Sequence, residues 1–250
     1  MIPKRITKFI KSLQIKKYRR QHQSFLVEGA KSVIELIYSD FEITTLLGTP
    51  VFLKENKNLL KDKSFEVFES SVEELSSLGT FKSNDSALAT AKMKPENKVN
   101  IAEGEWAVGL DDIKDPGNLG TIIRIADWYG FSKVICSENS AEFYNPKVIS
   151  ATMGSFTRID IFYTDLLSFI KNLNVPVYGA FLQGKDIHTF PLKESGGLIV
   201  MGNESAGIGQ ELAHIIHHKI SIPQYGQAES LNVAIATAII CDNFRRKEKE

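Results

Sequence analysis

The sequence predicts an α/β protein of two domains. Short apolar runs with the composition of strands alternate with segments of helical periodicity, first over residues 24–93 and again over residues 106–246. A polar stretch rich in Pro, Asn and Gly separates the two series, as a linker does. We therefore predict a first domain at residues 1–94, a linker at 95–104 and a second domain at 105–250.

The first domain is predicted to be a small α/β unit. Its apolar runs predict four strands, at Ser24–Glu28, Ile43–Leu47, Phe65–Phe68 and Ala87–Met93. Helical patterns lie between them at residues 30–38, 56–61 and 72–78, of which the second is weak.

The second domain repeats this alternation over a longer stretch. Strands are predicted at Trp106–Leu110, Lys133–Ser137, Phe156–Phe162, Val175–Phe181, Leu198–Met201 and Ile220–Ile222. Helices are predicted at residues 118–129, 146–153, 165–173, 210–218 and 230–246. The last helix is apolar nearly all round as far as Cys241, so we expect it to be largely buried.

The predicted helix at 118–129 has two distinct faces. Its apolar residues recur with helical spacing and predict a buried stripe of Leu119, Ile122, Ile123 and Ala126. The opposite face carries Thr121, Arg124 and Trp128. A Trp and an Arg on an outward face indicate a bound partner or ligand, and a surface Arg beside a half-exposed Trp is the plainer alternative.

Two loops near the carboxyl end follow predicted strands and are rich in Gly and small polar residues. Open α/β sheets bind ligands at such strand ends. The first loop, Gly202–Gly209, lacks the Lys-Ser/Thr of a phosphate-binding loop, the third Gly of a dinucleotide fingerprint and the spacing of a nucleophile elbow. The loops therefore suit a ligand that is not strongly anionic, with backbone groups holding a polar head and apolar residues a flat ring. Turn glycines that serve no ligand are the alternative.

The charge is balanced overall, with 30 basic and 30 acidic residues, but it is unevenly distributed. The first 27 residues contain eight basic and no acidic residues, which leaves 22 basic and 30 acidic residues in the rest. A cationic arm on an acidic body predicts contact with a polyanion such as RNA, and a solvated helix face or a frayed tail is the alternative. Phe9, Leu13 and Tyr18 interleave with the charges and favour an amphipathic segment docked on the protein.

Several other classes of protein are disfavoured. No apolar run approaches the ~20 residues of a membrane span, and no apolar core follows the basic N-terminus as in a secretory signal. Cys136 and Cys241 fit no metal spacing and are expected to be buried thiols. We expect no metal site and a cytoplasmic protein.

Three separated segments of the second domain stand out together. They read Asn118-Leu119-Gly120-Thr121-Ile122-Ile123-Arg124, then Gly202-Asn203-Glu204, then Ile222-Pro223 with Ser230-Leu231-Asn232-Val233. In this order they resemble the three motifs of the SpoU (TrmH) family of RNA ribose 2′-O-methyltransferases. Phe25–Gly29 also resembles the RNA-binding module that many members carry in front of the catalytic domain.

The resemblance implies a fold, a cofactor and an assembly. The second domain is expected to form a SPOUT-type parallel sheet with helices on both faces and a deep C-terminal trefoil knot. The first domain is expected to be a small α/β unit like ribosomal protein L30e that binds the RNA substrate. S-adenosylmethionine is the implied cofactor, held mostly by main-chain groups of the two loops. A homodimer is implied, with the helix at 118–129 and the last helix near its interface.

The same resemblance assigns residues to the site. The implied catalytic residues are Arg124, Asn118, Glu204, Ser230 and Asn232. The implied cofactor-binding residues are Met201, Gly202, Asn203, Ile222 and Leu231. The expected RNA-binding residues of the basic arm are Lys4, Arg5, Lys16, Lys17, Arg19 and Arg20. Because the pKa of Arg exceeds ~12, we expect Arg124 to stabilise the developing oxyanion rather than to accept its proton.

The remaining catalytic residues have expected roles around this arginine. Asn118 would fix Arg124 or the ribose, and Glu204 would anchor Asn118 or Arg124. Ser230 and Asn232 would close the pocket beside the cofactor, and helix-capping roles for Asn118 and Ser230 are the alternative.

The predicted function is S-adenosylmethionine-dependent methylation of a ribose 2′-hydroxyl in RNA, with ribosomal RNA favoured over transfer RNA. A transfer RNA 2′-O-methyltransferase, and an RNA-binding protein that kept the fold without the chemistry, are the alternatives. The intact set of motif residues argues against a non-catalytic protein.

Overall fold

The computed structural model describes residues 2–61, 63–95, 99–192 and 195–247, and the chain forms two compact units. One unit comprises Met1–Pro95 with Glu142–Thr157, and the other comprises Glu96–Ala141 with Arg158–Glu250. Residues 96–98 of the predicted linker lie outside the described residues, and Ile101 is buried in the core of the second unit.

The first unit is built on a four-stranded mixed sheet with the order β1-β4-β2-β3. Its strands are β1 (Ser24–Glu28), β2 (Ile43–Gly48), β3 (Glu66–Glu69) and β4 (Ala87–Lys92). β4 pairs antiparallel with both β1 and β2, and β2 pairs parallel with β3. The helices are α1 (Lys4–Ser12), α2 (Lys16–His22), α3 (Ala30–Tyr38), α4 (Pro50–Glu55), α5 (Lys57–Leu60), α6 (Val72–Leu78) and α8 (Pro146–Thr152).

The basic segment at the N-terminus is ordered as α1 and α2 and is docked on this unit. Ile6, Ile10 and Leu13 are buried in a cluster with apolar residues of β1, β2, α6 and β4. The charged residues of α1 alternate with this buried stripe, as expected of an amphipathic helix. The prediction of a docked segment is therefore correct, although Tyr18 is exposed and takes little part in it.

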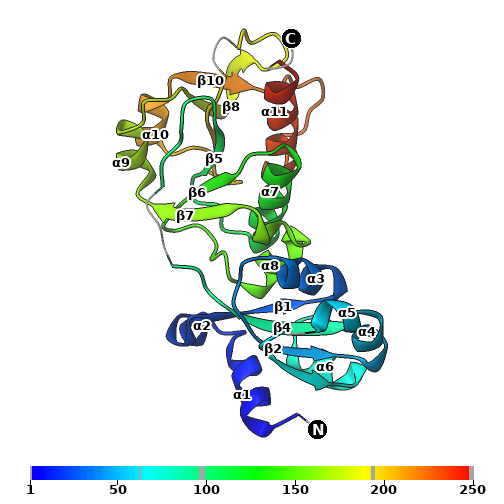
Figure 1. The fold of residues 1–250 in the computed structure, drawn as a ribbon. Helices are drawn as coiled ribbons and strands as arrows, with labels where there is room; N and C mark the ends of the chain where they lie inside the picture. The colour runs from blue at the N-terminus through cyan, green and yellow to red at the C-terminus, as the bar shows by residue number, and fades with distance from the viewer. Residues whose placement is uncertain (1, 62, 96–98, 193–194, 248–250) are drawn as a thin grey trace. The chain divides into compact units, whose positions relative to one another are not determined.

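The second unit contains a six-stranded sheet with the order β10-β8-β9-β5-β6-β7, in which every pairing of neighbours is parallel. Its strands are β5 (Trp106–Leu110), β6 (Lys133–Ser137), β7 (Asp160–Thr164), β8 (Val177–Asp186), β9 (Gly197–Met201) and β10 (His218–Ser221). Helices α7 (Pro116–Trp128) and α11 (Val233–Lys247) lie together on one side, and α9 (Leu166–Lys171) and α10 (Gln210–Ile215) lie on the other (Figure 1).

The two faces of this sheet have different cores. Under α9 and α10, Leu166, Ile170 and Leu212 pack on small and branched strand residues such as Ala107 and Val200. On the opposite face, Trp106 contacts the rings of Phe131, Tyr178 and Phe244, the last of which belongs to α11. Burial of both faces explains why these strands read as continuous apolar runs in the sequence.

Several predicted element limits need correction. The strand predicted at Phe156–Phe162 begins at Asp160, because Phe156 lies in a 3-10 turn and is buried in the first unit against Phe25 and Phe41. The last helix begins at Val233 rather than at Ser230; it is largely buried, as predicted, although Ile235 on it is 54% exposed.

Helix α4 was not predicted. It is short, and its start is fixed by the Thr49 hydroxyl, which accepts a hydrogen bond from the Phe52 N–H, with Pro50 in the first turn. Among the helices that the structure describes, none is both long enough and apolar enough to cross a bilayer.

Candidate functional site

The three predicted motifs meet at the carboxyl edge of the parallel sheet. Asp111 follows β5 and leads into α7, Gly202 follows β9, and Ile222 follows β10. β9 pairs directly with β5, which places the first two loops side by side. The chain then returns from β10, at the edge of the sheet, to α11 against α7.

Asn118 joins the three motifs through its side chain. Its Nδ2 donates to Glu204 Oε1 at 2.8 Å, and its Oδ1 accepts from Asn232 Nδ2 at 2.9 Å. Both functions of the amide are therefore used by the protein, and we call these three residues the asparagine bridge. Of the two partners expected for Glu204, the structure shows Asn118, and it shows no contact of Asn118 with Arg124 among the described residues.

The loop after β9 is a tight turn that depends on Gly202. The backbones of Asn203 and Gly207 exchange two hydrogen bonds, and Asn203 Oδ1 accepts from the N–H groups of Ser205 and Ala206. A Cβ atom on Gly202 would lie 2.2 Å from the carbonyl carbon of Gly207, so only glycine fits this position.

Two aspartates after β5 hold this loop in place, and the sequence reasoning did not identify them. Asp111 Oδ2 accepts from the Gly209 N–H at 2.8 Å, and the Asp112 carbonyl accepts from Asn203 Nδ2 at 2.8 Å. Asp112 has a φ of 60°, a left-handed conformation that Asp tolerates better than most residues. Two consecutive Asp residues directly after a predicted strand are typical of a turn, and this pattern could have indicated their role in the loop.

The start of α7 is set by a third aspartate. Asp115 caps the helix by accepting from the Asn118 N–H at 2.8 Å, and Pro116 occupies the first turn. The Asn118 side chain is thus free of the capping role and points to its two partners. The Asp-Pro pair three residues before Asn118 was a readable signal for this helix start.

Asn232, rather than Ser230, caps α11. Its Oδ1 accepts from the N–H groups of Ala234 and Ile235 at 2.9 and 3.3 Å, while its Nδ2 reaches Asn118. Ser230 is exposed and lies three residues before the helix, and Leu231 is 49% exposed. Ile222 is partly buried and Met201 is buried at the end of β9.

Arg124 lies on the exposed face of α7, as the periodicity predicted, and the stripe from Leu119 to Ala126 is buried. Within the part of the chain that the structure describes, Arg124 makes no hydrogen bond or ion pair. Trp128 on the same helix is 83% exposed. The guanidinium is therefore available to a ligand or to another chain.

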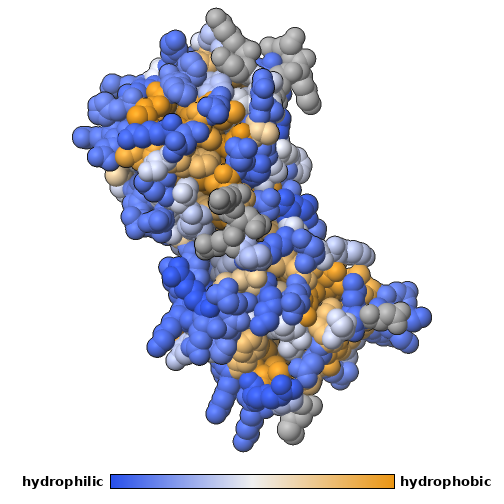
Figure 2. All heavy atoms as spheres, turned by 60° about the vertical axis from the view of Figure 1, so that its left-hand side comes forward, coloured by the Kyte–Doolittle hydropathy of each residue, from blue (hydrophilic) through white to orange (hydrophobic). Residues whose placement is uncertain are grey.

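The basic arm divides into exposed and buried cations. Lys16, Lys17 and Arg20 are exposed on α2 and are called the α2 patch below; Lys4 and Arg5 are exposed on α1, where Arg5 pairs with Glu66. Hydrophilic side chains cover much of the face of the molecule seen in Figure 2.

Arg19 is the exception and corrects the predicted RNA-binding set. It is 2% exposed, its guanidinium pairs with Glu142, and it also donates to the carbonyls of Leu13 and Gln14. Because these contacts occupy it inside the protein, we withdraw Arg19 from the residues expected to contact RNA.

The two cysteines are buried, as expected, and take no part in the site. Burial raises the pKa of the Cys136 thiol to about 12 and also raises that of Cys241. Both thiols are therefore neutral at physiological pH. No group of three or more His, Cys, Asp or Glu residues that could hold a metal ion occurs among the described residues.

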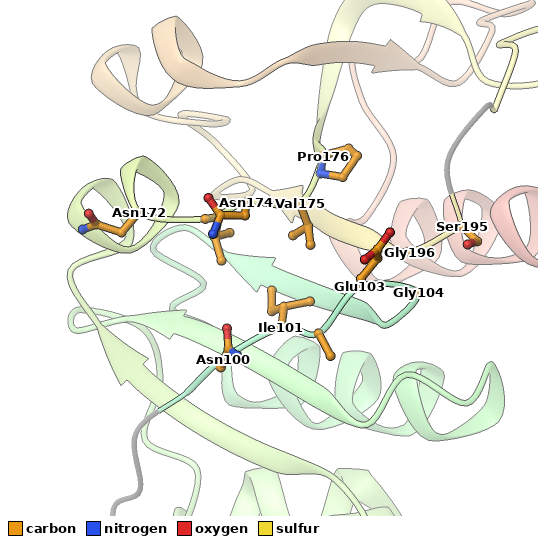
Figure 3. Close-up of a pocket in the computed structure, with 12 residues that line it drawn as sticks. Asn100, Ile101, Glu103, Gly104, Asn172, Asn174, Val175, Pro176, Ser195 and Gly196 are labelled. Atoms are coloured by element: carbon orange, nitrogen blue, oxygen red, sulfur yellow. The ribbon is translucent and has the colours of Figure 1, made fainter.

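A cavity of about 720 Å³ lies at the opposite edge of the same sheet (Figure 3). Its lining residues precede β5, β8 and β9, and include Ile101, Asn174, Val175, Pro176 and Gly196. It contains none of the motif residues, so we do not assign the cofactor to it.

Two family descriptions match the chain. The SpoU rRNA Methylase family matches residues 105–242, and the MRM3-like substrate binding domain matches residues 4–89. The 23S rRNA (guanosine(2553)-2′-O)-methyltransferase RlmP of Bacillus subtilis is 33% identical over 241 residues, which cover 94% of each chain.

Solved structures of similar proteins agree with this match. An rRNA methyltransferase from Sinorhizobium meliloti with bound AdoMet (S-adenosylmethionine) has a TM-score of 0.87 and 32% identity over 98% of this chain and 96% of its own. An RNA methyltransferase of the TrmH family from Porphyromonas gingivalis, described as putative, has a TM-score of 0.84 and 33% identity over 99% of both chains.

Proposed function

The chain belongs to the SpoU rRNA methylase family, and from this premise we propose that it methylates a ribose 2′-hydroxyl of ribosomal RNA with S-adenosylmethionine. The observation that carries the proposal is the asparagine bridge, which joins all three family motifs at one edge of the sheet. A relative that matches over nearly the whole chain is a 23S rRNA 2′-O-methyltransferase by name, which favours ribosomal over transfer RNA.

The two loops have the composition that S-adenosylmethionine needs. The charged residues in the ranges 202–209 and 222–232 are Glu204 and Glu229, and neither range contains Lys or Arg. Negative charge attracts a sulfonium cation and repels a phosphate, so these loops suit the former better. We propose that Met201, Gly202, Asn203, Ile222 and Leu231 hold it. The bound cofactor supplies an activated methyl group on a positively charged sulfur.

The chain's own residues then have to position the ribose and manage one proton. The ribose 2′-oxygen would receive the methyl group of the bound cofactor, and the hydroxyl proton would leave to a phosphate oxygen or water. We propose that Arg124, which is exposed on α7 and has no hydrogen-bond or ion-pair partner among the described residues, stabilises the developing oxyanion electrostatically. Asn118, Glu204 and Asn232 act as positioning residues that hold both loops against α7, and Ser230 closes the pocket.

The first unit is proposed to bind the RNA. Its N-terminal helices carry the exposed basic residues Lys4, Arg5 and the α2 patch, which suit a phosphate backbone. Its mixed sheet is covered by helices, in keeping with the expected likeness to ribosomal protein L30e. We keep the roles of domains 1–94 and 105–250 as predicted.

The knot and the dimer are also part of the proposal. A trefoil knot is supported by the path of the chain, which leaves the sheet edge at β10 and returns to pack α11 on α7, where Asn232 and the Gly202–Gly209 loop both contact Asn118. A homodimer through α7 and α11 is supported by Trp128 and Ile235, large apolar side chains exposed on these two helices. A protein that modifies ribosomal RNA is expected in the cytoplasm.

Two measurements test the function. Calorimetry should detect binding of S-adenosylmethionine and none of ATP or NAD; preference for ATP or NAD would remove the proposed cofactor. Mapping of 2′-O-methyl groups in RNA from cells with and without the gene should reveal one lost site in ribosomal RNA. A lost site in transfer RNA would correct the substrate, and an unchanged map would remove the activity.

A further inference from the structure

The loop between β10 and α11 carries an exposed aromatic ring, Tyr225, which has no role in the proposed methyl transfer. Tyr225 is 95% exposed, the highest value among the large hydrophobic side chains that the structure describes. No ring or cation of the described residues packs against it. A ring that is almost fully exposed, with no ring or cation partner among the described residues, can present its face to a partner.

The loop that carries Tyr225 is internally braced. Gln224 Nε2 donates to the carbonyls of both Gly226 and Ala228 at 2.9 Å. The Gln224 side chain thereby links the two ends of the segment 224–228. Bracing lowers the conformational entropy that the ring would lose on binding. The backbone that carries Tyr225 is therefore prepared to present the ring.

This loop is also a wall of the proposed catalytic site. It ends at Leu231 and Asn232, and Asn232 is tied to Asn118 and through it to Glu204. One loop therefore carries both the exposed ring and a residue of the proposed site. The loop offers no Lys or Arg to a phosphate, and Tyr225 is the one aromatic residue of its sequence.

We infer that Tyr225 stacks on an unpaired base of the RNA beside the methylated ribose. This inference rests on the proposed function. Specific recognition of RNA favours splayed bases that stack on aromatic side chains. A base stacked on an aromatic ring contributes about 1–3 kcal/mol by alanine substitution, which corresponds to about 5- to 150-fold in affinity.

The test compares variants on an unmodified 23S rRNA transcript from the source organism. Tyr225→Ala should lower kcat/KM for the transcript by about 5- to 150-fold, and its filter-binding affinity should fall in parallel. Tyr225→Phe and Tyr225→Trp, which keep a ring, should stay within about threefold of the wild type. Gln227→Ala, an exposed neighbour in the same loop, is the matched control and should be unchanged.

Three results would overturn the inference. Equal activity and RNA affinity of Tyr225→Ala and wild type would remove the stack. A matching loss of S-adenosylmethionine affinity by calorimetry would assign the ring to the cofactor, and a changed mass in sedimentation would assign it to a protein interface. If the wild type failed to methylate the transcript, the proposed function would fail, and the filter-binding comparison would still decide whether Tyr225 contacts RNA.

Discussion

Replacing Asn118 with Asp changes one NH2 group of the asparagine bridge into a charged oxygen. Asn118 Nδ2 lies 2.8 Å from Glu204 Oε1, so the substitution puts two carboxylates in contact. The acceptor toward Asn232 is kept, and the geometry of the side chain is unchanged. The substitution therefore acts on a single contact, the one between α7 and the Gly202–Gly209 loop.

The magnitude follows from this distance and from the exposure of Glu204. Two unit charges 2.8 Å apart repel by about 1.5 kcal/mol in water, the appropriate limit for an exposed carboxylate. The hydrogen bond to the charged oxygen, which contributed roughly 1.5 kcal/mol, is lost as well. If this loss falls entirely on the cofactor-bound arrangement, S-adenosylmethionine affinity should drop by as much as about 100-fold at pH 8.

The effect should depend on pH with a definite sign. Two adjacent carboxyls raise the pKa of the pair above its usual range, so the repulsion is present at pH 8 and is relieved as the pH falls and one group takes up a proton. A protonated carboxyl can donate to its neighbour and restore the bond. Calorimetry of S-adenosylmethionine binding at pH 8 and pH 5.5 measures both values.

The control exchanges the amide and the carboxylate between positions 118 and 204. Asn118→Asp combined with Glu204→Gln puts an amide donor opposite the new carboxylate and should recover most of the affinity. Asn139→Asp, on an exposed asparagine of another loop, should change nothing. The reasoning is refuted if Asn118→Asp binds S-adenosylmethionine as tightly as the wild type, or if the double variant is weaker than both single variants.

The remaining predictions concern other parts of the molecule. Arg124→Ala should abolish methyl transfer and leave calorimetric S-adenosylmethionine binding nearly intact; methylation at the wild-type rate would remove this residue from the mechanism. Gly202→Ala should lower S-adenosylmethionine affinity by at least about tenfold, because the new Cβ meets backbone at 2.2 Å, whereas Gly226→Ala, with nothing within 4 Å, should bind normally. Changing the α2 patch to Glu should weaken RNA binding most at low salt and reduce the salt dependence measured by filter binding; equal affinity at all salt concentrations would rule out docking through α2. Arg19→Ala should instead destabilise the fold by about 3 kcal/mol in denaturant unfolding, because Glu142 loses a buried partner, and an unchanged midpoint would contradict its structural role.

Local patterns in the sequence were sufficient for most of the fold. Strands β5 and β9 are buried along their whole length, so their apolar runs were readable, and the stripe from Leu119 to Ala126 is buried as the periodicity predicted. The start of α11 was misassigned because Ser230 and Asn232 are both good caps by type. The choice between them depends on Asn118, which is more than a hundred residues away.

The contacts that could not be predicted from the sequence are polar contacts between residues far apart in the chain. Arg19 looked like any other cation of the basic arm, and its partner Glu142 is separated from it by 123 residues. The same applies to Asp111, whose carboxylate meets Gly209 across the sheet edge. Composition and spacing describe neither the burial of a charge nor the partner that compensates for it.

The chemistry of the product tests the central claim most directly. Wild-type protein is incubated with 23S rRNA transcript and S-adenosylmethionine labelled in its methyl group, and the RNA is then hydrolysed in alkali, which cleaves only beside a free 2′-hydroxyl. We predict that the label appears in one alkali-resistant dinucleotide. Label released in mononucleotides would mean methylation of a base, and unlabelled RNA would mean no transfer, and either result would contradict the account.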